Sequence, residues 1–218
     1  MTGIAENLQA IRERLRAAPG VTLLAVTKGQ SVERVREAAA AGQNAFGENY
    51  VQEALAKMPA APGLEWHLIG PLQSNKTRAA AEHFDWVQTI DREKIARRLS
   101  EQRPAALAPL NVLIQVNASG EASKSGVVPG EAERLAAAVH DMPRLRLRGL
   151  MAIPEPGAPS ERYREVKAIF DRLRGRYSLD TLSMGMSQDM DVAIAEGSTM
   201  VRIGTAIFGP REKAKGAA

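Results

Sequence analysis

The amino-acid sequence predicts a single (β/α)8 barrel, the TIM-barrel fold, with an extra helix at the N-terminus. Strand and helix patterns alternate eight times within 218 residues, and no long linker or shift of composition divides them. Several strand segments are apolar along their whole length, as expected for strands buried on both faces of a parallel sheet. Eight such strands joined by right-handed crossovers close into a barrel without an exposed edge.

The first four strands are expected at residues 22–28, 45–47, 65–69 and 85–90, each followed by turn residues or a helical pattern. The opening helix, over residues 4–17, has Leu8, Ile11 and Leu15 at helical spacing. Further helices are expected from residue 31, over residues 51–58 and after residue 74. Asp91 is expected to be the N-cap of the helix that follows the fourth strand.

The second half of the chain repeats this pattern four more times. The fifth strand, at residues 110–116, is the most apolar and leads through a Gly/Ser-rich loop to a helix over residues 131–140. Strands at 145–153, 180–184 and 199–203 alternate with helices over 160–174 and 189–195. We therefore expect one domain over residues 1–218, with the barrel core at about 21–211, the N-terminal helix within 1–20 and a tail at 212–218.

An open, doubly wound sheet is the competing architecture. A dinucleotide-binding sheet of that kind has a glycine-rich turn after its first strand, and Thr27-Lys28-Gly29-Gln30 is not such a turn. Residues 120–126 contain glycine, serine and lysine, but not at the spacing of a phosphate-binding loop. The barrel is the favoured fold.

Composition excludes several classes of protein. The apolar fraction of 44% and charged fraction of 25% are those of a globular protein in water. The absence of cysteine excludes disulfides and thiolate ligands, and the three histidines have no partners at metal-ligand spacing, so we expect no metal site. The first residues lack a signal-peptide core and no segment approaches about 18 apolar residues in a row, which predicts a cytoplasmic protein without a membrane partner.

The charge pattern gives no sign of a nucleic-acid partner. The formal net charge is +4, and arginines cluster in three places, but aromatic residues make up only 4% of the chain. No stacking platform or groove-reading motif accompanies the arginines, so we expect them to lie on solvated helix faces. We expect a monomer, because no partnering domain is evident.

Lys28 closes the apolar run of the first strand. The carboxyl ends of parallel strands are where barrel and doubly wound folds place their chemistry. An amine there is partly dehydrated, which disfavours the ammonium form and favours a nucleophile that attacks carbonyl groups. The alternative is a lysine that extends from the strand end into water, and this segment alone does not exclude it.

The loops after the seventh and eighth strands are the usual phosphate site of a barrel. Ser187 is placed to cap the next helix or to offer its hydroxyl to a phosphate. Gly204 allows close approach of the backbone, and Thr205 adds a second hydroxyl. Simple capping and a structural glycine remain the alternatives for these residues.

Arg202 interrupts the apolar eighth strand. Alternation places it on the same face as Met200 and Gly204, which is the barrel interior if Val201 and Ile203 face the helices. An unpaired charge there would cost several kcal/mol, so Arg202 needs an acceptor, either a structural carboxylate or a ligand at the barrel mouth. An amine, phosphate donors and this arginine together match pyridoxal 5′-phosphate, an aldehyde that carries a phosphate and a ring acceptor.

Short motifs spread over nearly the whole chain are shared with one known family. They are Phe46-Gly47-Glu48-Asn49-Tyr50, Trp66-His67-Leu68-Ile69-Gly70, Leu72-Gln73-Ser74-Asn75-Lys76, Ser123-Lys124-Ser125-Gly126, Leu182-Ser183-Met184-Gly185-Met186-Ser187, Glu196-Gly197-Ser198-Thr199 and Val201-Arg202-Ile203-Gly204. From about residue 21 to residue 211, the chain resembles the YggS/PROSC-type pyridoxal phosphate homeostasis proteins. Those proteins share the barrel of the alanine racemase cofactor domain.

The resemblance implies specific roles. Lys28 would hold pyridoxal 5′-phosphate as a covalent aldimine (Schiff base), with Arg202 at the pyridine nitrogen and Asn49 beside the ring. The resemblance assigns the phosphate to Ser187, Gly204 and Thr205. One departure follows the lysine, where family members often have threonine and then proline but this chain reads Gly29-Gln30-Ser31. This departure bears on the shape of the first loop.

The resemblance also implies a non-catalytic carrier that takes part in intracellular homeostasis of the cofactor, with cofactor-dependent apo-enzymes as partners. A guanidinium only donates hydrogen bonds, so it leaves the ring nitrogen unprotonated and the ring a weak electron sink. The alternative is an amino-acid racemase, which needs acid/base groups on both faces of the substrate. Similar racemases take the second group, a tyrosine, from another domain. Nothing in this sequence assigns that role to Tyr50, Tyr163 or Tyr177. A third interpretation is a cofactor-free Schiff-base aldolase or dehydratase.

Other side chains are weaker candidates. His67 shares a strand face with Ile69, and core packing is favoured over a supporting role in the site. Lys76 and Lys124 lie on or near loops at the mouth and are candidate secondary aldehyde acceptors, although solvated lysines are favoured. The methionines at 184, 186 and 190 are expected to pack in the core.

Overall fold

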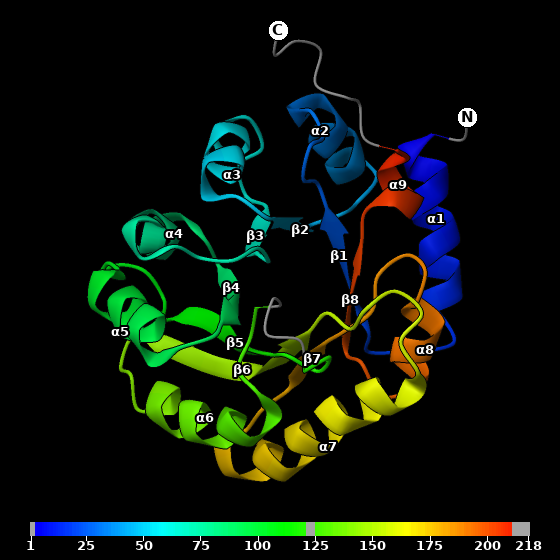
Figure 1. The fold of residues 1–218 in the computed structure, drawn as a ribbon. Helices are drawn as coiled ribbons and strands as arrows, with labels where there is room; N and C mark the ends of the chain where they lie inside the picture. Colours follow the sequence, from blue (N-terminus) through cyan, green and yellow to red (C-terminus); the bar gives the residue numbers. More distant parts are fainter. Residues whose placement is uncertain (1–2, 121–124, 211–218) are drawn as a thin grey trace, which may run out of the picture.

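At the centre of the computed structural model, which describes residues 3–120 and 125–210, eight parallel strands form a closed barrel (Figure 1). Each strand pairs with its successor, and β8 pairs with β1. The strands are β1 (Thr22–Val26), β2 (Ala45–Glu48), β3 (Glu65–Leu68), β4 (Trp86–Ile90), β5 (Leu110–Val116), β6 (Leu145–Ala152), β7 (Thr181–Ser183) and β8 (Met200–Ile203). The expected (β/α)8 fold is confirmed.

The helices surround this barrel, and Figure 1 looks roughly along its axis. They are α1 (Ile4–Leu15), α2 (Val32–Ala40), α3 (Val51–Lys57), α4 (Thr77–His83), α5 (Glu93–Gln102), α6 (Ala132–His140), α7 (Ser160–Tyr177), α8 (Met190–Ala195) and α9 (Thr205–Phe208). Three 3-10 turns, η1 (Met58–Ala60), η2 (Ser74–Lys76) and η3 (Pro129–Glu131), lie before or after helices. The extra helix α1 packs against α2 and α9. Within the described residues, every helix is too short or too polar to traverse a bilayer.

Two boundaries differ from the sequence-based expectation. β1 ends at Val26 rather than at residue 28, because the Thr27 carbonyl accepts hydrogen bonds from the Gln30 amide and from Lys57. Lys28 therefore lies in the turn after the strand. The prediction for Asp91 is wrong, because α5 begins one residue later with Arg92 as its N-cap, and the Asp91 carboxylate accepts from Arg92 instead. The short helix α9 was not expected.

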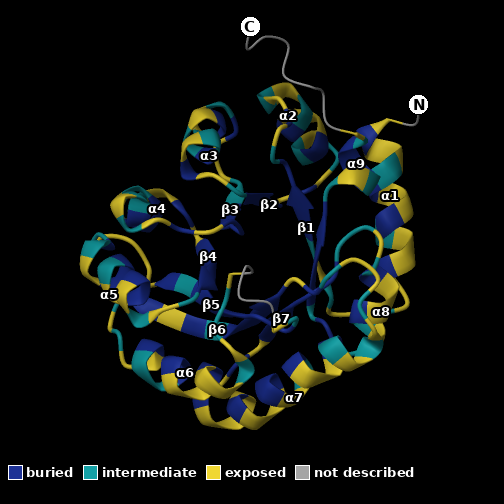
Figure 2. Cartoon of the chain, viewed as in Figure 1, coloured by how far each residue is buried: buried dark blue, intermediate teal, exposed yellow. Residues whose placement is uncertain are grey.

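The buried residues divide into a shell outside the sheet and a filling inside it. The larger apolar core lies between strands and helices and includes Phe46, Val201 and Ile203. Smaller clusters of apolar side chains fill the barrel itself, among them Leu24, Val26, Ala45, Ile69 and Met200, and separately Trp86, Leu113 and Met151. In Figure 2 the strands are dark blue and the outward helix faces are yellow, which shows the same division.

Candidate functional site

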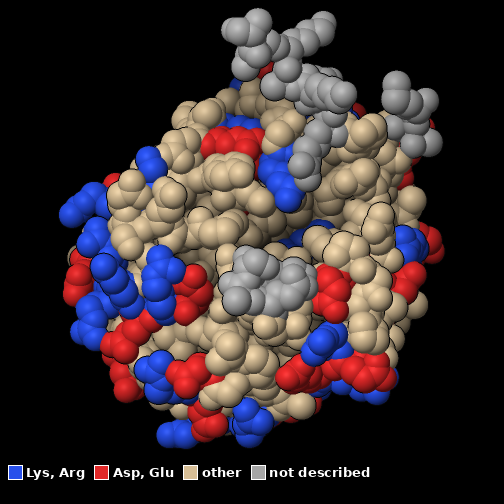
Figure 3. Space-filling view, in the orientation of Figure 1, with Lys and Arg blue, Asp and Glu red and all other residues tan. Residues whose placement is uncertain are grey.

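A cavity of about 350 Å³ opens at the carboxyl ends of β2, β3, β5 and β6. Its lining consists of Asn49, Ile69, Gly70, Pro71, Gln115, Val116, Asn117, Ser125, Ile153, Pro154, Pro156 and Met186. The face seen in Figure 3 is hollowed near its centre, with Lys or Arg side chains beside and within the hollow. Barrels place their chemistry at this end of the strands.

The turn that carries Lys28 is held from one helix. Helix α3 supplies Lys57, whose ammonium donates to the Thr27 carbonyl at 2.8 Å, and Glu53, whose carboxylate accepts from the Gly29 amide at 2.5 Å. These backbone groups immediately precede and follow Lys28, which is itself half-buried. Leu24 and Val26, on the strand that leads to this turn, face the barrel interior. Two charged side chains of α3 therefore fix the backbone on both sides of Lys28.

Beneath this turn lies a buried ion pair. The Lys57 ammonium also donates to Glu48 Oε1 at 2.6 Å, and the Thr27 hydroxyl donates to the same oxygen at 2.7 Å. The side chains of Glu48 and Lys57 are 0% and 8% exposed. Burial raises the pKa of Glu48, and the hydrogen bonds from Lys57 and Thr27 partly oppose that rise. The ion pair joins β2 and α3 to the end of β1.

Arg202 lies inside the barrel and is 3% exposed. Its Nη1 donates to the carbonyl and the hydroxyl of Ser183, both at 2.7 Å, and its Nη2 donates to the Ala152 carbonyl at 2.8 Å. Burial lowers the pKa of Arg202 to about 10, so the guanidinium stays charged at neutral pH.

The predicted phosphate donors come together where β8 meets α9. The Ser187 hydroxyl accepts a hydrogen bond from the Ala206 amide at 3.4 Å, so it faces the start of α9 and does not cap α8, whose N-cap is Asp189. Gly204 lies against β1, and a Cβ there would be 3.2 Å from the Val26 carbonyl oxygen. Thr205 is exposed. The three predicted phosphate donors therefore lie around the backbone that joins β8 to α9.

A second contact orders the loop after β7. Asp189 accepts from the Met186 amide at 2.7 Å with one oxygen and from the Tyr163 hydroxyl at 2.6 Å with the other. Burial and the bond to Asp189 raise the pKa of Tyr163. Met186 lines the cavity, whereas Met184 and Met190 are fully buried as expected. The expectation for Met186 was wrong because this loop turns toward the mouth.

Asn49 follows β2 and is half-buried at the cavity wall. Its backbone lies so close to Gly70 that a Cβ at Gly70 would be 2.1 Å from the Asn49 carbonyl oxygen. The Thr89 hydroxyl donates to the Gly70 carbonyl at 2.9 Å and holds this second strand end in place. Gly70 is therefore the residue that lets Asn49 approach the cavity.

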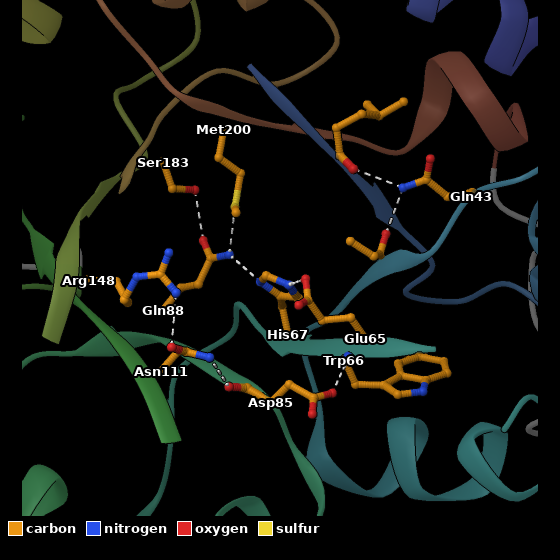
Figure 4. A network of polar contacts seen from close by, with 12 residues as sticks. Gln43, Glu65, Trp66, His67, Asp85, Gln88, Asn111, Arg148, Ser183 and Met200 are labelled. Carbon is orange, nitrogen blue, oxygen red and sulfur yellow. Dashed lines mark hydrogen bonds and ion pairs between the residues drawn. The ribbon is translucent and has the colours of Figure 1, made fainter. Parts of the chain in front are cut away.

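A chain of polar side chains runs through the interior of the barrel (Figure 4). It comprises Ser183, Gln88, His67 and Glu65, each hydrogen-bonded to the next. His67 is 0% exposed and stacks on Trp86 with ring centroids 5.0 Å apart. Burial lowers the pKa of His67, which keeps the imidazole neutral.

Several residues of the site were missed from sequence. Glu48 was noted only as part of a shared motif, core packing was favoured for His67, and Lys57 was not singled out within the helix expected over residues 51–58. Gln88 offered the clearest signal, since it interrupts a buried strand in the same way as Arg202. Lys76 is half-buried in η2, and Lys124 lies outside the described residues. In the described part of the chain, no cluster of three His, Asp or Glu side chains is arranged to hold a metal ion.

Comparisons with known proteins point in one direction. The family model described as alanine racemase, N-terminal domain, matches residues 1–212. A pyridoxal phosphate homeostasis protein of Pseudomonas aeruginosa is 57% identical over 227 residues, which cover 97% of each chain. That of Escherichia coli (strain K12) is 54% identical over 233 residues, 99% of this chain and all of the relative.

Solved structures agree. The structure of PipY from Synechococcus elongatus PCC7942 without PLP has a TM-score of 0.87 and 38% sequence identity, and covers 94% of this chain and 100% of PipY. The structure of the same protein with PLP bound has a TM-score of 0.84 and 36% identity over the same shares of both chains. Both the barrel and the sequence are therefore similar to those of one group of proteins.

Proposed function

The chain belongs to the alanine racemase N-terminal domain family, among the pyridoxal phosphate homeostasis proteins, and we propose that it binds pyridoxal 5′-phosphate (PLP) and takes part in PLP homeostasis. The structure of the relative PipY with PLP bound supports this proposal. In the proposed complex Lys28 binds the aldehyde covalently, Ser187, Gly204 and Thr205 hold the phosphate, and Arg202 and Asn49 contact the ring.

One observation carries the proposal: the buried charge of Arg202 stands next to the strand that leads to Lys28. In the register of the sheet, Leu24 of β1 lies opposite Arg202 of β8. An amine in the turn after β1 and a guanidinium on the adjacent strand β8 suit a ligand with an aldehyde at one position and a hydrogen-bond acceptor at another. The pyridine ring of PLP has both.

Two features of the site fit this cofactor. The guanidinium of Arg202 is held inside the barrel by its hydrogen bonds to Ser183 and to the Ala152 carbonyl. At Gly204 a Cβ would lie 3.2 Å from the Val26 carbonyl oxygen, so the glycine lets the start of α9 lie close to the end of β1. A buried guanidinium and the backbone amides beside a glycine suit a ring nitrogen and a phosphate.

The covalent step requires no other reactant. The neutral amine of Lys28 attacks the aldehyde carbon, a C=N bond forms, the carbonyl oxygen leaves as water, and no atom changes its oxidation state. The reverse reaction, hydrolysis or exchange with another amine, releases the aldehyde. This reversibility suits a carrier that loads and unloads.

Carrier function is favoured over racemisation because racemisation needs an acid/base group on each face of the substrate Cα, and Lys28 supplies only one. Arg202 only donates hydrogen bonds, so it would leave the ring nitrogen without a proton, which also disfavours decarboxylation and transamination. The Tyr163 hydroxyl is bound to Asp189, and its raised pKa makes it a poor second acid/base group. The proposed form is a cytoplasmic, single-domain monomer, with PLP-dependent apo-enzymes as the proposed recipients.

The decisive experiment is borohydride trapping. The protein incubated with PLP is expected to show a visible absorption band that reduction abolishes, with the label mapped to Lys28 by mass spectrometry. Lys28→Arg removes the label, and Lys76→Arg, on a half-buried lysine of η2, retains it. A label at another lysine overturns the assignment to Lys28, and absence of binding overturns the function. Rapid exchange of the Cα proton of alanine in deuterated water would favour the racemase.

A further inference from the structure

A continuous hydrogen-bond chain links Arg202 near the mouth to Glu65 at the opposite end of the barrel. Arg202 Nη1 donates to the Ser183 hydroxyl at 2.7 Å, and that hydroxyl contacts Gln88 Oε1 at 2.8 Å. Gln88 Nε2 lies 2.9 Å from His67 Nδ1, and His67 Nε2 lies 2.8 Å from Glu65 Oε1. In Figure 4 the links from Ser183 to Glu65 cross the interior from β7 through β4 to β3.

The direction of every bond in the chain follows from its two ends. A guanidinium only donates and a carboxylate only accepts, so each group between them accepts from the Arg202 side and donates toward Glu65. The Ser183 hydroxyl therefore donates to the Gln88 carbonyl oxygen, and the Gln88 amide donates to His67 Nδ1. His67 is then the neutral tautomer with its proton on Nε2, which donates to Glu65.

Two further contacts support this direction. The second proton of Gln88 Nε2 faces the Met200 sulfur at 3.2 Å, whereas a reversed amide would turn its oxygen toward that acceptor. His67, Gln88 and Ser183 are all 0% exposed, so water does not compete for these bonds. Each buried polar group is thus satisfied in one orientation only.

We propose that Gln88 and His67 are positioning residues that hold the guanidinium of Arg202 in the orientation in which it meets the ring of PLP. This inference deepens the proposed function and rests on it. Ser183 contacts Arg202 directly, and Gln88 fixes the Ser183 hydroxyl so that its lone pairs point to Nη1. His67, locked between Gln88 and Glu65 and stacked on Trp86, fixes the Gln88 amide in turn.

The first test uses the protein without cofactor. In ¹⁵N NMR spectra we expect His67 as the Nε2–H tautomer and Arg202 with separate, slowly exchanging Nη–H signals. Gln88→Leu is expected to speed the exchange of these protons at least tenfold. A matched control is Gln43→Leu, since Gln43 is also buried but donates to the carbonyls of Leu23 and Ala45. The Nδ1–H tautomer, or unchanged Arg202 signals in Gln88→Leu, would overturn the proposal.

The second test uses the PLP-loaded protein. Gln88→Leu is expected to weaken PLP binding about tenfold and to shift the absorption band, while Gln43→Leu changes neither. His67→Phe keeps the ring that stacks on Trp86 but removes both hydrogen bonds, and it serves if Gln88→Leu does not fold. An unshifted band in either folded variant contradicts the proposal. Failure of the unmodified protein to bind PLP would end the proposed function, while the measurements without cofactor would still test the chain of hydrogen bonds.

Discussion

The ammonium of Lys57 lies 2.6 Å from the carboxylate of Glu48, and both side chains are buried directly below the turn that carries Lys28. The same ammonium holds the Thr27 carbonyl, so one cation on α3 serves both a buried charge and the backbone of the site. A buried ion pair contributes little net stability, because the cost of removing both charges from water offsets their attraction. The pair nevertheless requires one specific geometry. Here that geometry sets the position of the residue proposed to bind the cofactor.

Lys57→Met is expected to destabilise the fold by about 3–5 kcal/mol, because it leaves the Glu48 carboxylate buried without a cation. Urea unfolding measures this loss. The control is Lys94→Met on an exposed position of α5, which is expected to change stability by less than about 0.5 kcal/mol. The double variant Glu48→Leu with Lys57→Met should recover part of the loss. Equal stability of Lys57→Met and the unmodified protein would contradict the ion-pair account.

Arg202→Lys is expected to weaken PLP binding at least tenfold and to shift its absorption band, because an ammonium cannot replace the planar guanidinium between Ser183 and Ala152. Arg103→Lys is the matched control. Arg103 is also buried and donates to the carbonyls of Ala81, Phe84 and Ala108, outside the site. It should lower stability without moving the band. A band that shifts equally in both variants would mean that the effect is one of general stability.

Gly70→Ala is expected to destabilise the protein by about 1–3 kcal/mol and to lower PLP affinity. The new methyl group would stand 2.1 Å from the Asn49 carbonyl oxygen, so the backbone at the cavity wall has to move. Thermal unfolding and spectral titration measure the two effects. Gly130→Ala, where nothing lies within 4 Å of the added carbon, is the control and should keep wild-type affinity. Unchanged stability and PLP affinity in Gly70→Ala would show that the backbone at the cavity wall moves without a loss of free energy.

The free energy of unfolding is expected to fall as the pH drops below the ordinary His67 pKa of 6.5. Burial lowers the pKa of His67, so below that pH the unfolded chain binds a proton that the folded chain does not, which favours unfolding. The slope from this residue approaches about 1.4 kcal/mol per pH unit at most. Urea titrations at several pH values should give a flatter profile for His67→Phe. Parallel profiles would mean that the pKa of His67 is the same in the folded and unfolded states.

The position of Arg202 at the barrel mouth could be predicted because the residue lies on a strand. The alternation of Val201, Arg202 and Ile203 between two faces is a local property, so the inward charge of Arg202 was visible in the sequence. Lys57 was not, because it stands on an amphipathic helix where a lysine is ordinarily solvated. Its burial arises only when α3 packs beside the turn after β1, which is tertiary information.

The loop contacts were beyond sequence reasoning for a similar reason. Ser187 lies where a helix cap is expected, but its hydroxyl accepts from the Ala206 amide in α9. The sequence did not reveal α9, because a helix of four residues is too short to leave a periodic signal. Gln88 could have been found by the argument applied to Arg202. Its partners could not, since His67, Ser183 and Met200 come from three other strands.

The pairing of β1 with β8 makes the two ends of the barrel sequence neighbours in space. In the proposed complex, PLP contacts residues at the ends of both strands, so complete binding requires the last strand to be in place. Bound in this way, PLP would connect β1 to β8 at the seam where the barrel closes. Loading should therefore slow hydrogen exchange most at the amides of that seam, because opening it requires the ligand to leave first.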